Sequence, residues 1–583
     1  MLSAIREIGK WRIKEGNKSS FDVLIQEPFK ERKDKETDNV LFIQINFENN
    51  SFVGIDLEDY DKNKKEKYLY RKGSPNGFNP TPAAVITDLD KTFPNKIENW
   101  FKKYSESNYL NIEGKNILKQ VFDIIYNNKT QITTELKDKI SNLKKKTGKL
   151  LTLKLKFKDD YLYLGDIELF RKILLEDCKP KIDNGCQENR CCSVCGEFKI
   201  SFTDKPGVFK FYTIDKPGFI TGGFNEKNEI KNFPVCTDCK EQIEEGKNFI
   251  EKSLSYRFYG HKYYLIPKLL TGKIENSETM SILLDTSRIV SLKDEVKNKI
   301  TNDEKEILYE LKNEKDSISF NLFFLEKDMG AEKIVLLVED VLPSRFRTIF
   351  EAKNFVEEKF DDSFTFGKIR EFFSKSDENK RENDLDKYFL EIVDKIFRGV
   401  SIEFSFLVKF FIKKIRKKFI DDEYFNSMVK NAMMDTLFLE KLKIINFEED
   451  KSMNQTIFED IFQKYSKSLN YPAKKGIFLL GTLAQLLLNK QWEVRKAKPF
   501  MKKLKGLKME ERDIKALLPE IQNKFEEYDN SFDKGKQLIA REVSKLLLEA
   551  GDNWKMSVDE INYYFSCGMN LSQEIADNVY AKE

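Results

Sequence analysis

Cys192-Ser-Val-Cys195-Gly196 and Cys236-Thr-Asp-Cys239 are two short cysteine pairs that decide how the centre of this chain folds. In each pair two residues separate the cysteines, so that both thiolates lie on one tight turn, and Gly196 lets the backbone curl back toward a metal. Four sulfur ligands complete a tetrahedral shell with no open position for a substrate. We therefore expect one structural zinc ion per chain, held by Cys192, Cys195, Cys236 and Cys239 and clipping together a small β-rich lobe.

Two further cysteines, Cys186 and Cys191, lie close to the first pair. Cys191 competes with Cys192 for a place in the ligand set, but only Cys192 has the two-residue spacing to Cys195. The alternative interpretation is four ordinary buried thiols. Metal binding contributes roughly 10–16 kcal/mol in isolated zinc modules, which is enough to decide whether such a lobe folds.

The composition excludes several classes of function. The 583 residues include 1 histidine, His261, so nucleases and hydrolases that rely on several imidazoles are excluded. His261 lies between aromatic residues, which favours packing over general-base chemistry. The chain contains no Gly-Lys-Ser/Thr phosphate cradle and no Gly-x-Gly-x-x-Gly turn. Lys and Arg (101) nearly balance Asp and Glu (97), so any nucleic-acid surface must be a local patch.

The length predicts three or four domains, an apolar content of 40% is ample for their cores, and the mixture of strand-like and helix-like runs predicts an α+β fold. We expect a mixed N-terminal α+β domain over residues 1–185 and a four-cysteine zinc lobe over 186–275. A middle α+β region over 276–450 follows, and an all-helical C-terminal bundle occupies 451–583.

Local patterns support this division. Val40–Phe47 is rich in β-forming residues, and Leu151–Phe157 alternates apolar and basic residues as a half-exposed strand does. Lys333–Val338 predicts a buried strand. Asn111–Tyr126 has the spacing of an amphipathic helix.

Beyond residue 450 the apolar residues recur at helical spacing. Ile477–Leu488 predicts a buried helix that is too short for a membrane span. Ser557 and Glu560 form a capping-box signature at the start of another helix. Three segments beyond residue 450 each show one apolar face. Their residues are, in order along the chain, Ile457, Phe458, Ile461, Phe462 and Tyr465, then Ile514, Leu517, Leu518, Ile521 and Phe525, and finally Ile561, Tyr564 and Phe565.

The cellular compartment follows from two features. Met1–Arg6 contains no apolar run that resembles a signal peptide. Eight cysteines in so long a chain, four of them with metal spacing, do not indicate a disulfide framework. We expect a cytoplasmic protein without membrane association.

Several segments resemble the large subunit of the type I-B CRISPR interference complex, Cascade. The most specific are Phe209-Lys-Phe-Tyr-Thr-Ile-Asp-Lys-Pro-Gly-Phe219, Asn232-Phe-Pro-Val-Cys236-Thr-Asp-Cys239 and Glu245-Gly246-Lys247. Three others agree in order, namely Tyr70-Arg-Lys-Gly-Ser-Pro-Asn-Gly-Phe-Asn-Pro-Thr-Pro82, Glu339-Asp-Val-Leu-Pro-Ser-Arg345 and Tyr564-Phe-Ser-Cys-Gly-Met-Asn-Leu571. The resemblance covers essentially the whole chain.

The resemblance implies a non-catalytic subunit of a crRNA-guided complex in antiviral defence. Such a subunit recognises the protospacer-adjacent motif and target DNA, supports R-loop formation and recruits a separate helicase–nuclease. The implied partners are the crRNA, the target double-stranded DNA, the displaced single strand, the helicase–nuclease, and the backbone, crRNA-end and small subunits. The resemblance also implies that the C-terminal part is made separately as the small subunit, with Met453 as the expected start and Met428, Met433 and Met434 as alternatives.

Two segments carry the principal candidates for nucleic-acid binding, and two further basic stretches, Lys144–Lys158 and Lys409–Lys418, are either solvated faces or tracks for a single strand. The loop after Tyr70 carries Arg71, Lys72, Asn76 and Asn79, and Arg and Asn side chains can pair bidentately with guanine and adenine edges. The alternative is an ordinary connection between strands. The second segment, Lys490–Lys508, carries eight basic residues and one acid, and its loop contains Lys502, Lys503 and Lys505. A charge run is most often only a solvated face.

Two other classes of function compete with this interpretation. A metal-dependent nuclease could use the carboxylates of Asp56, Asp59 and Asp61 or of Asp421–Glu423 to hold magnesium, although no further motif supports such a site. A zinc-clipped protein scaffold without nucleic acid is the third hypothesis.

Overall fold

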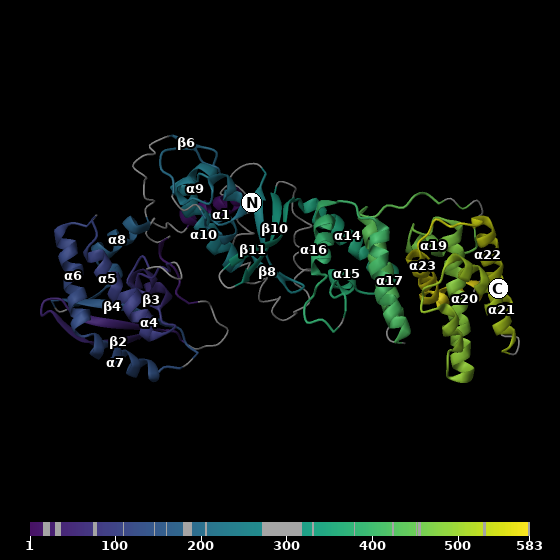
Figure 1. The fold of residues 1–583 in the computed structure, drawn as a ribbon. Coiled ribbons are helices and arrows are strands. Elements are labelled where there is room, and N and C mark those ends of the chain that lie inside the picture. The colour runs from purple at the N-terminus through teal and green to yellow at the C-terminus, as the bar shows by residue number, and fades with distance from the viewer. Residues whose placement is uncertain are drawn as a thin grey trace. The chain divides into compact units, whose positions relative to one another are not determined.

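The computed structural model describes residues 1–15, 24–29, 37–73, 79–108, 110–144, 146–158, 160–178, 189–203, 207–270, 318–328, 331–377, 379–421, 425–450, 452, 456–528 and 532–580 (Figure 1). The chain divides into two compact units, Met1–Lys252 and Ser253–Glu583. Each unit combines helices with a β-sheet, and the last helices form an all-helical region. The predicted α+β fold class is therefore confirmed.

A five-stranded mixed sheet organises the first unit. Its order is β2-β1-β4-β3, with β5 paired to the free part of β4. β1 pairs antiparallel with β2 and parallel with β4, so the two strands predicted from sequence lie side by side. The strands are β1 (Asn39–Asn46), β2 (Ser51–Asp59), β3 (Ala84–Val85), β4 (Lys149–Phe157) and β5 (Asp160–Tyr163).

Both faces of this sheet are covered. Leu41, Ile43 and Ile45 of β1 pack on one face against a cluster that includes Trp100 and Phe170. The other face buries Val40 and Phe42 of β1 against Tyr68 and Tyr70. The helices that complete the larger cluster are α5 (Asn99–Ser105), α6 (Ile112–Asn127), α7 (Lys129–Ser141) and α8 (Glu168–Cys178). The helix predicted over Asn111–Tyr126 is α6, whose first turn is capped by the Asn111 side chain.

Two helices of the first unit touch through glycines. A Cβ on Gly246 of α10 (Thr237–Ser253) would lie 2.1 Å from the carbonyl oxygen of Ile5 in α1 (Leu2–Glu15). A Cβ on Gly9 would lie 1.8 Å from the carbonyl oxygen of Gln242. Only a residue without a side chain allows such a backbone contact.

The second unit begins with an antiparallel four-stranded sheet of order β11-β10-β9-β8. The strands are β8 (Ser255–Phe258), β9 (His261–Leu269), β10 (Ile318–Asp328) and β11 (Ala331–Val341). The predicted strand Lys333–Val338 lies within β11, but the expectation that it is buried is wrong for most of it. β11 is an edge strand, and Ile334 remains 37% exposed.

In the described residues after this sheet, the regular elements of the second unit are helices. They are α14 (Pro343–Phe360), α15 (Phe366–Phe373), α16 (Asp386–Arg398), α17 (Phe404–Ile420), α18 (Phe425–Lys441), α19 (Glu459–Tyr465), α20 (Pro472–Arg495), η7 (Pro499–Leu504), α21 (Glu511–Glu526), α22 (Lys534–Ala550), α23 (Val558–Asn570) and α24 (Ser572–Tyr580). The predicted capping box is confirmed, since Ser557 and Glu560 exchange hydrogen bonds at the start of α23.

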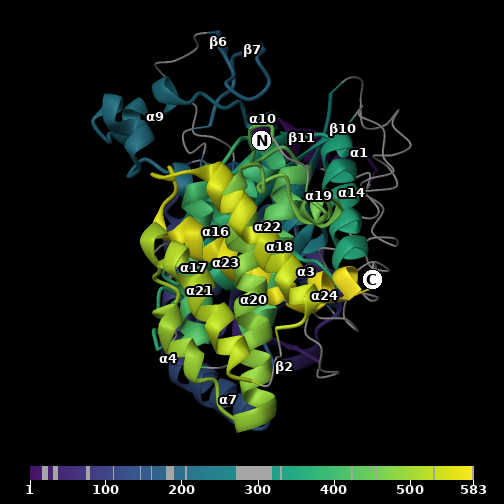
Figure 2. The same ribbon diagram turned by 90° about the vertical axis from the view of Figure 1, so that its right-hand side faces the viewer.

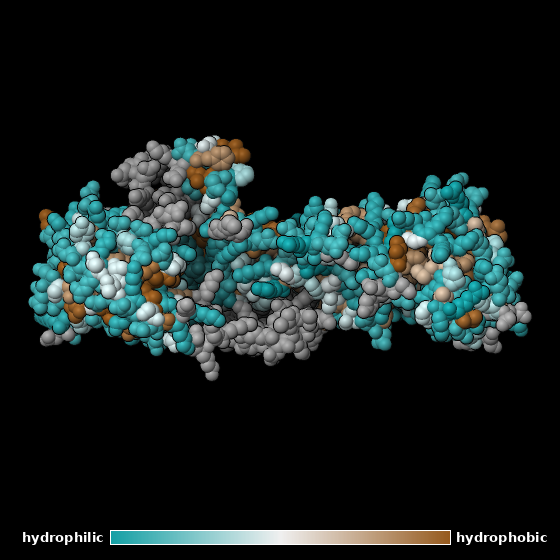
Figure 3. All heavy atoms as spheres, turned by 60° about the horizontal axis from the view of Figure 1, so that its bottom comes forward, coloured by the Kyte–Doolittle hydropathy of each residue, from teal (hydrophilic) through white to brown (hydrophobic). Residues whose placement is uncertain are grey.

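α20 is the central helix of the C-terminal region (Figure 2). It contacts α21, α22, α23 and α24, and its segment Ile477–Leu488 is largely buried, as predicted. Within the described ranges no helix has the length and apolar character needed to cross a membrane. The face of the molecule drawn in Figure 3 is mostly hydrophilic.

The C-terminal helices also pack against helices that precede residue 451. α17 and α18 both contact α23. The Tyr563 hydroxyl of α23 lies 2.8 Å from the Thr436 hydroxyl of α18, and both are buried. The Tyr563 ring also meets Phe404 and Phe411 of α17. α23 therefore has neighbours on both sides of residue 451.

Candidate metal centre and nucleic-acid interface

The four predicted metal ligands converge in the first unit. Cys192 and Cys195 lie in the turn between β6 (Arg190–Cys191) and β7 (Phe198–Lys199), whereas Cys236 and Cys239 lie at the start of α10. Gly196 has a left-handed φ of 72°, and its amide donates to the Cys192 carbonyl oxygen at 2.9 Å. The glycine thus closes the turn in the way that its position predicts.

The sulfur atoms of these cysteines all lie within 4.8 Å of one another. Cys192, Cys236 and Cys239 are buried and Cys195 is partly exposed. The amides of Val194 and Cys236 each donate to Cys192 Sγ at 3.4 Å. Four converging sulfur donors with such support fit a bound metal ion of the zinc type.

The neighbouring cysteines do not join this cluster. Cys191 is exposed, and its thiol lies 3.4 Å from the Gly196 carbonyl oxygen. The structure therefore places Cys192, and not Cys191, among the four candidate metal ligands. Cys186 lies outside the described residues.

The thiols also influence one another electrostatically. The hydrogen bond with Cys239 lowers the pKa of Cys236 to about 5, and the same contact raises the pKa of Cys239. A divalent cation would favour deprotonation of these thiols, because metal binding to cysteine releases protons.

Arg71 holds the candidate recognition loop to the body of the first unit. Its guanidinium donates to the Leu24 carbonyl oxygen at 2.9 Å and pairs with the Glu244 carboxylate of α10 at 3.2 Å. The side chain is only 14% exposed. In this conformation the groups that would read a guanine edge already have partners within the protein.

Asn79 is likewise a structural residue of this loop. It is 6% exposed. Its side-chain oxygen accepts from the Gly73 amide at 3.1 Å, and its side-chain amide donates to the Ala83 carbonyl oxygen at 2.8 Å. Lys72 is exposed, and Asn76 lies outside the described residues. Among the described residues of this segment, Lys72 is exposed to a ligand, whereas Arg71 and Asn79 are held by contacts within the protein.

The basic loop contains the 3₁₀ helix η7, and part of its charge is balanced by α21. Lys503 lies 3.1 Å from Glu520, and Lys505 lies 2.7 Å from Asp513. The hydrogen bond from Lys505 lowers the pKa of Asp513. Lys502 is exposed. The charge of this segment is thus smaller in the fold than its local sequence indicates.

The acidic cluster proposed for a nuclease has internal partners. Lys154, which is almost buried, pairs with Asp56 at 2.7 Å and with Glu58. Asp59 accepts a hydrogen bond from Asn39, and Asp61 caps the short helix η1 (Lys62–Lys64). Asp421 is exposed, while Glu423 lies outside the described residues. In the part of the chain that the structure describes, the His, Cys, Asp and Glu side chains that are grouped closely enough to hold a metal ion are those of the cysteine cluster.

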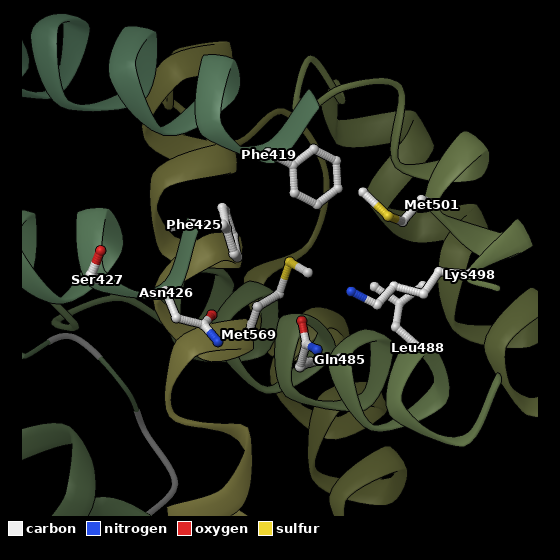
Figure 4. A pocket seen from close by; sticks show the side chains of 9 residues that line it. All are labelled: Phe419, Phe425, Asn426, Ser427, Gln485, Leu488, Lys498, Met501 and Met569. Atoms are coloured by element: carbon white, nitrogen blue, oxygen red, sulfur yellow. The ribbon is translucent and has the colours of Figure 1, made fainter. Parts of the chain in front are cut away.

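A pocket that sequence reasoning missed opens among the helices of the second unit (Figure 4). It has a volume of about 380 Å³. The lining residues are Phe419, Phe425, Asn426, Ser427, Gln485, Leu488, Lys498, Met501 and Met569. They come from α17, α18, α20, α23 and the segment around η7, so no local sequence pattern could have indicated the pocket.

Comparison with known families gives three matches along the chain. They are the N-terminal domain of CRISPR-associated protein TM1802 over residues 1–176, its central domain over 189–341 and its C-terminal domain over 364–583. The matches follow the order of the domains in the family. No curated protein matches the chain.

Proposed function

The chain belongs to the CRISPR-associated TM1802 family, and from that premise we propose that it is the large subunit of a type I-B crRNA-guided Cascade complex. The observation that carries the proposal is the succession of all three family domains. The segments that resemble the type I-B large subunit fall within or beside these domains. Its role lies in antiviral defence.

In this role the subunit recognises the protospacer-adjacent motif in duplex DNA, supports R-loop formation and recruits a separate helicase–nuclease. Guide pairing then reads the target sequence, while protein reads a short motif and the nucleic-acid backbone. Its partners are the crRNA, both strands of the target, and the backbone, crRNA-end and small subunits. The exposed Lys72 and the exposed Lys502 are suited to phosphate contacts, and Asn76 remains the candidate for base reading.

The proposed subunit is not an enzyme. Two observations support this part of the proposal. The chain has a single histidine, and that residue, His261, lies beside Asp386, which also pairs with Arg370. The carboxylates of Asp56 and Glu58 are paired with Lys154. The metal centre is proposed to hold one zinc ion, whose chemistry here is the structural crosslinking of the β6–β7 turn to α10.

Co-purification tests the assignment directly. The protein, tagged and produced in its own cells, is expected to bring down a short repeat-derived RNA and the other subunits. A Lys119→Ala, Lys139→Ala variant removes two exposed charges outside the candidate segments, serves as a control for bulk charge and should retain the assembled complex. Recovery of the folded protein without any RNA would contradict the proposal.

The competing nuclease hypothesis has its own test. Purified protein is incubated with labelled DNA and magnesium, next to an Asp56→Asn variant. We expect intact DNA with both proteins. Metal-dependent cleavage that disappears in the variant would establish the nuclease instead.

A further inference from the structure

The pocket between α17, α18, α20, η7 and α23 has two kinds of wall. Figure 4 shows the rings of Phe419 and Phe425 beside the thioethers of Met501 and Met569, which form its apolar part. The two rings meet edge to face with centroids 5.2 Å apart. Phe419 and Met569 are buried, whereas Phe425 and Met501 are half-buried.

The other wall is polar. Figure 4 shows the Lys498 ammonium directed into the pocket and the Gln485 side-chain oxygen on the pocket side, while Asn426 and Ser427 lie at its edge. The Gln485 side-chain amide donates to Asn489 at 2.8 Å. The Lys498 ammonium lies 5.6 Å from the centre of the Trp492 ring, which is 51% exposed. An aromatic surface, side-chain amides and a cation thus lie together.

Crosslinks between helices hold these walls in place. Arg416 of α17 donates to the Leu507 carbonyl oxygen at 2.7 Å and pairs with Asp559 at 2.8 Å. Asn570 at the end of α23 donates to the Asn426 carbonyl oxygen of α18 at 2.7 Å. The pocket is therefore a formed feature of the second unit, and a ligand would not have to create it.

We infer that this pocket receives one unstacked nucleobase of a single-stranded nucleic acid. A base has flat apolar faces for Phe425 and the methionines, and a polar edge for Gln485 and Asn426. The volume of about 380 Å³ lies at the small end of ligand pockets, which suits one base with its sugar. Lys498, and the exposed Lys502 next to Met501 in the chain, are positioned to meet the adjoining phosphates.

An apolar side chain of a partner protein fits the same pocket less well. It would displace water from the Gln485 and Asn426 amides and from the Lys498 ammonium without offering them hydrogen bonds, whereas the edge of a nucleobase offers both donors and acceptors. The inference rests on the proposed function, because it supplies a site for a strand that a crRNA-guided complex must handle. It goes further by assigning one base to named residues.

The test compares a base-bearing strand with an abasic strand of equal length and charge, using the full-length protein. We expect the wild type to bind labelled oligodeoxyadenylate roughly 5- to 100-fold more tightly than the abasic strand, as base–aromatic stacking predicts. Phe425→Leu should lose most of that difference and leave binding of the abasic strand unchanged. Phe410→Leu is the matched control, since this half-buried ring of α17 packs on Phe373 and lies outside the pocket.

Three outcomes would overturn the inference. The first is equal affinity of the wild type for the two strands. The second is a Phe425→Leu protein whose affinity falls equally for both strands. The third is a Phe425→Leu protein that no longer assembles into the complex but keeps its preference for the base-bearing strand. The last result would identify a partner protein as the occupant. Failure of the wild type to bind either strand would also remove the nucleic-acid contact from the proposed function.

If the Phe425→Leu protein is unfolded at the assay temperature, a second variant supplies the test. Gln485→Leu removes an amide from a half-exposed position without enlarging the pocket. It should bring the affinities for oligodeoxyadenylate and oligothymidylate closer together. An unchanged ratio in a folded Gln485→Leu protein would contradict base recognition at this site.

Discussion

At the residue scale, Arg71 shows how a side chain suited to one task is used for another. An arginine in a loop rich in Gly, Pro and Asn resembles a base-reading residue. In the fold its guanidinium joins the Leu24 carbonyl oxygen to the Glu244 carboxylate. Hydrogen bonds to charged groups contribute about 1.5–3 kcal/mol, and their loss leaves the partners unpaired.

We therefore predict different consequences for two adjacent residues. Arg71→Ala should lower the free energy of unfolding by about 1.5–3 kcal/mol, measured by denaturant titration. Lys72→Ala, at an exposed position, should leave stability within about 0.5 kcal/mol and reduce the salt slope of DNA binding by about one unit. The opposite result would be an Arg71→Ala protein that is as stable as the wild type but discriminates less well among duplexes with permuted motif bases. That result would show that Arg71 reads bases.

The cysteine cluster permits an equally specific prediction. The wild type should carry about one zinc ion per chain, and Cys236→Ser should carry much less, because one of the four thiolates that hold the ion is removed. Cys191→Ser is the control, since that thiol lies outside the cluster and should not change metal content. Elemental analysis of the purified proteins gives the result. Zinc retained by Cys236→Ser would refute the ligand set.

At the element scale, the crossing of α20 and α23 depends on two glycines. A Cβ on Gly568 would lie 1.7 Å from the Phe478 carbonyl oxygen, and one on Gly481 would lie 2.0 Å from the Phe565 carbonyl oxygen. The helices touch through their backbones at these points. Gly568 belongs to the closing segment that resembles the type I-B large subunit. The close backbone contact explains why a glycine occupies this position.

Gly568→Ala is predicted to destabilise the second unit by about 3 kcal/mol or more, because rigid backbone cannot move aside. Gly476→Ala on α20, the helix whose backbone Gly568 of α23 touches, is the comparison variant. Its Cβ would meet the end of the Leu547 side chain at 2.7 Å, and that side chain can adjust. The gain in helix propensity, about 1 kcal/mol, then offsets part of the strain. Thermal unfolding should separate the two variants, and equal melting temperatures would contradict the role of the backbone contact.

The lysines of η7 give a second prediction for an element. Each phosphate contact that is lost should reduce the salt slope of nucleic-acid binding by about one unit. Lys502→Gln should show that change in the assembled complex. Lys503→Gln and Lys505→Gln should show less, because Glu520 and Asp513 already balance these charges. An unchanged slope in the triple variant would exclude η7 as a contact.

At the scale of the whole molecule, the C-terminal helices share a core with α17 and α18. The family's C-terminal domain begins at residue 364 and includes both helices. Met453, the expected internal start, lies outside the described residues. A product that starts there would lack the partners of Tyr563 on α17 and α18.

We predict that residues 453–583 fold as a helical module, because α20 keeps its contacts with α21, α22, α23 and α24. Residues 364–583 should be more stable, since they retain the cover over α23. Circular dichroism of the two fragments during thermal unfolding measures the difference. An insoluble 453–583 fragment would refute the separable module, and equal stability would show that α17 and α18 contribute little.

The sequence by itself determined the features that depend on neighbours along the chain. Cysteines separated by two residues share one turn whatever surrounds them, so the ligand set could be predicted with its glycine. The α6 helix, the β1 and β4 strands and the Ser557 capping box follow equally from local spacing and backbone chemistry.

Tertiary structure alone decided which groups remain available to a ligand. Arg71 meets Glu244 from 173 positions away, and Lys503 meets an acid on the following helix. The nucleobase pocket assembles side chains from five separate elements. Contacts of this kind depend on how helices cross and strands pair. Where such a contact buries or pairs a charged side chain, that charge is no longer available to a ligand.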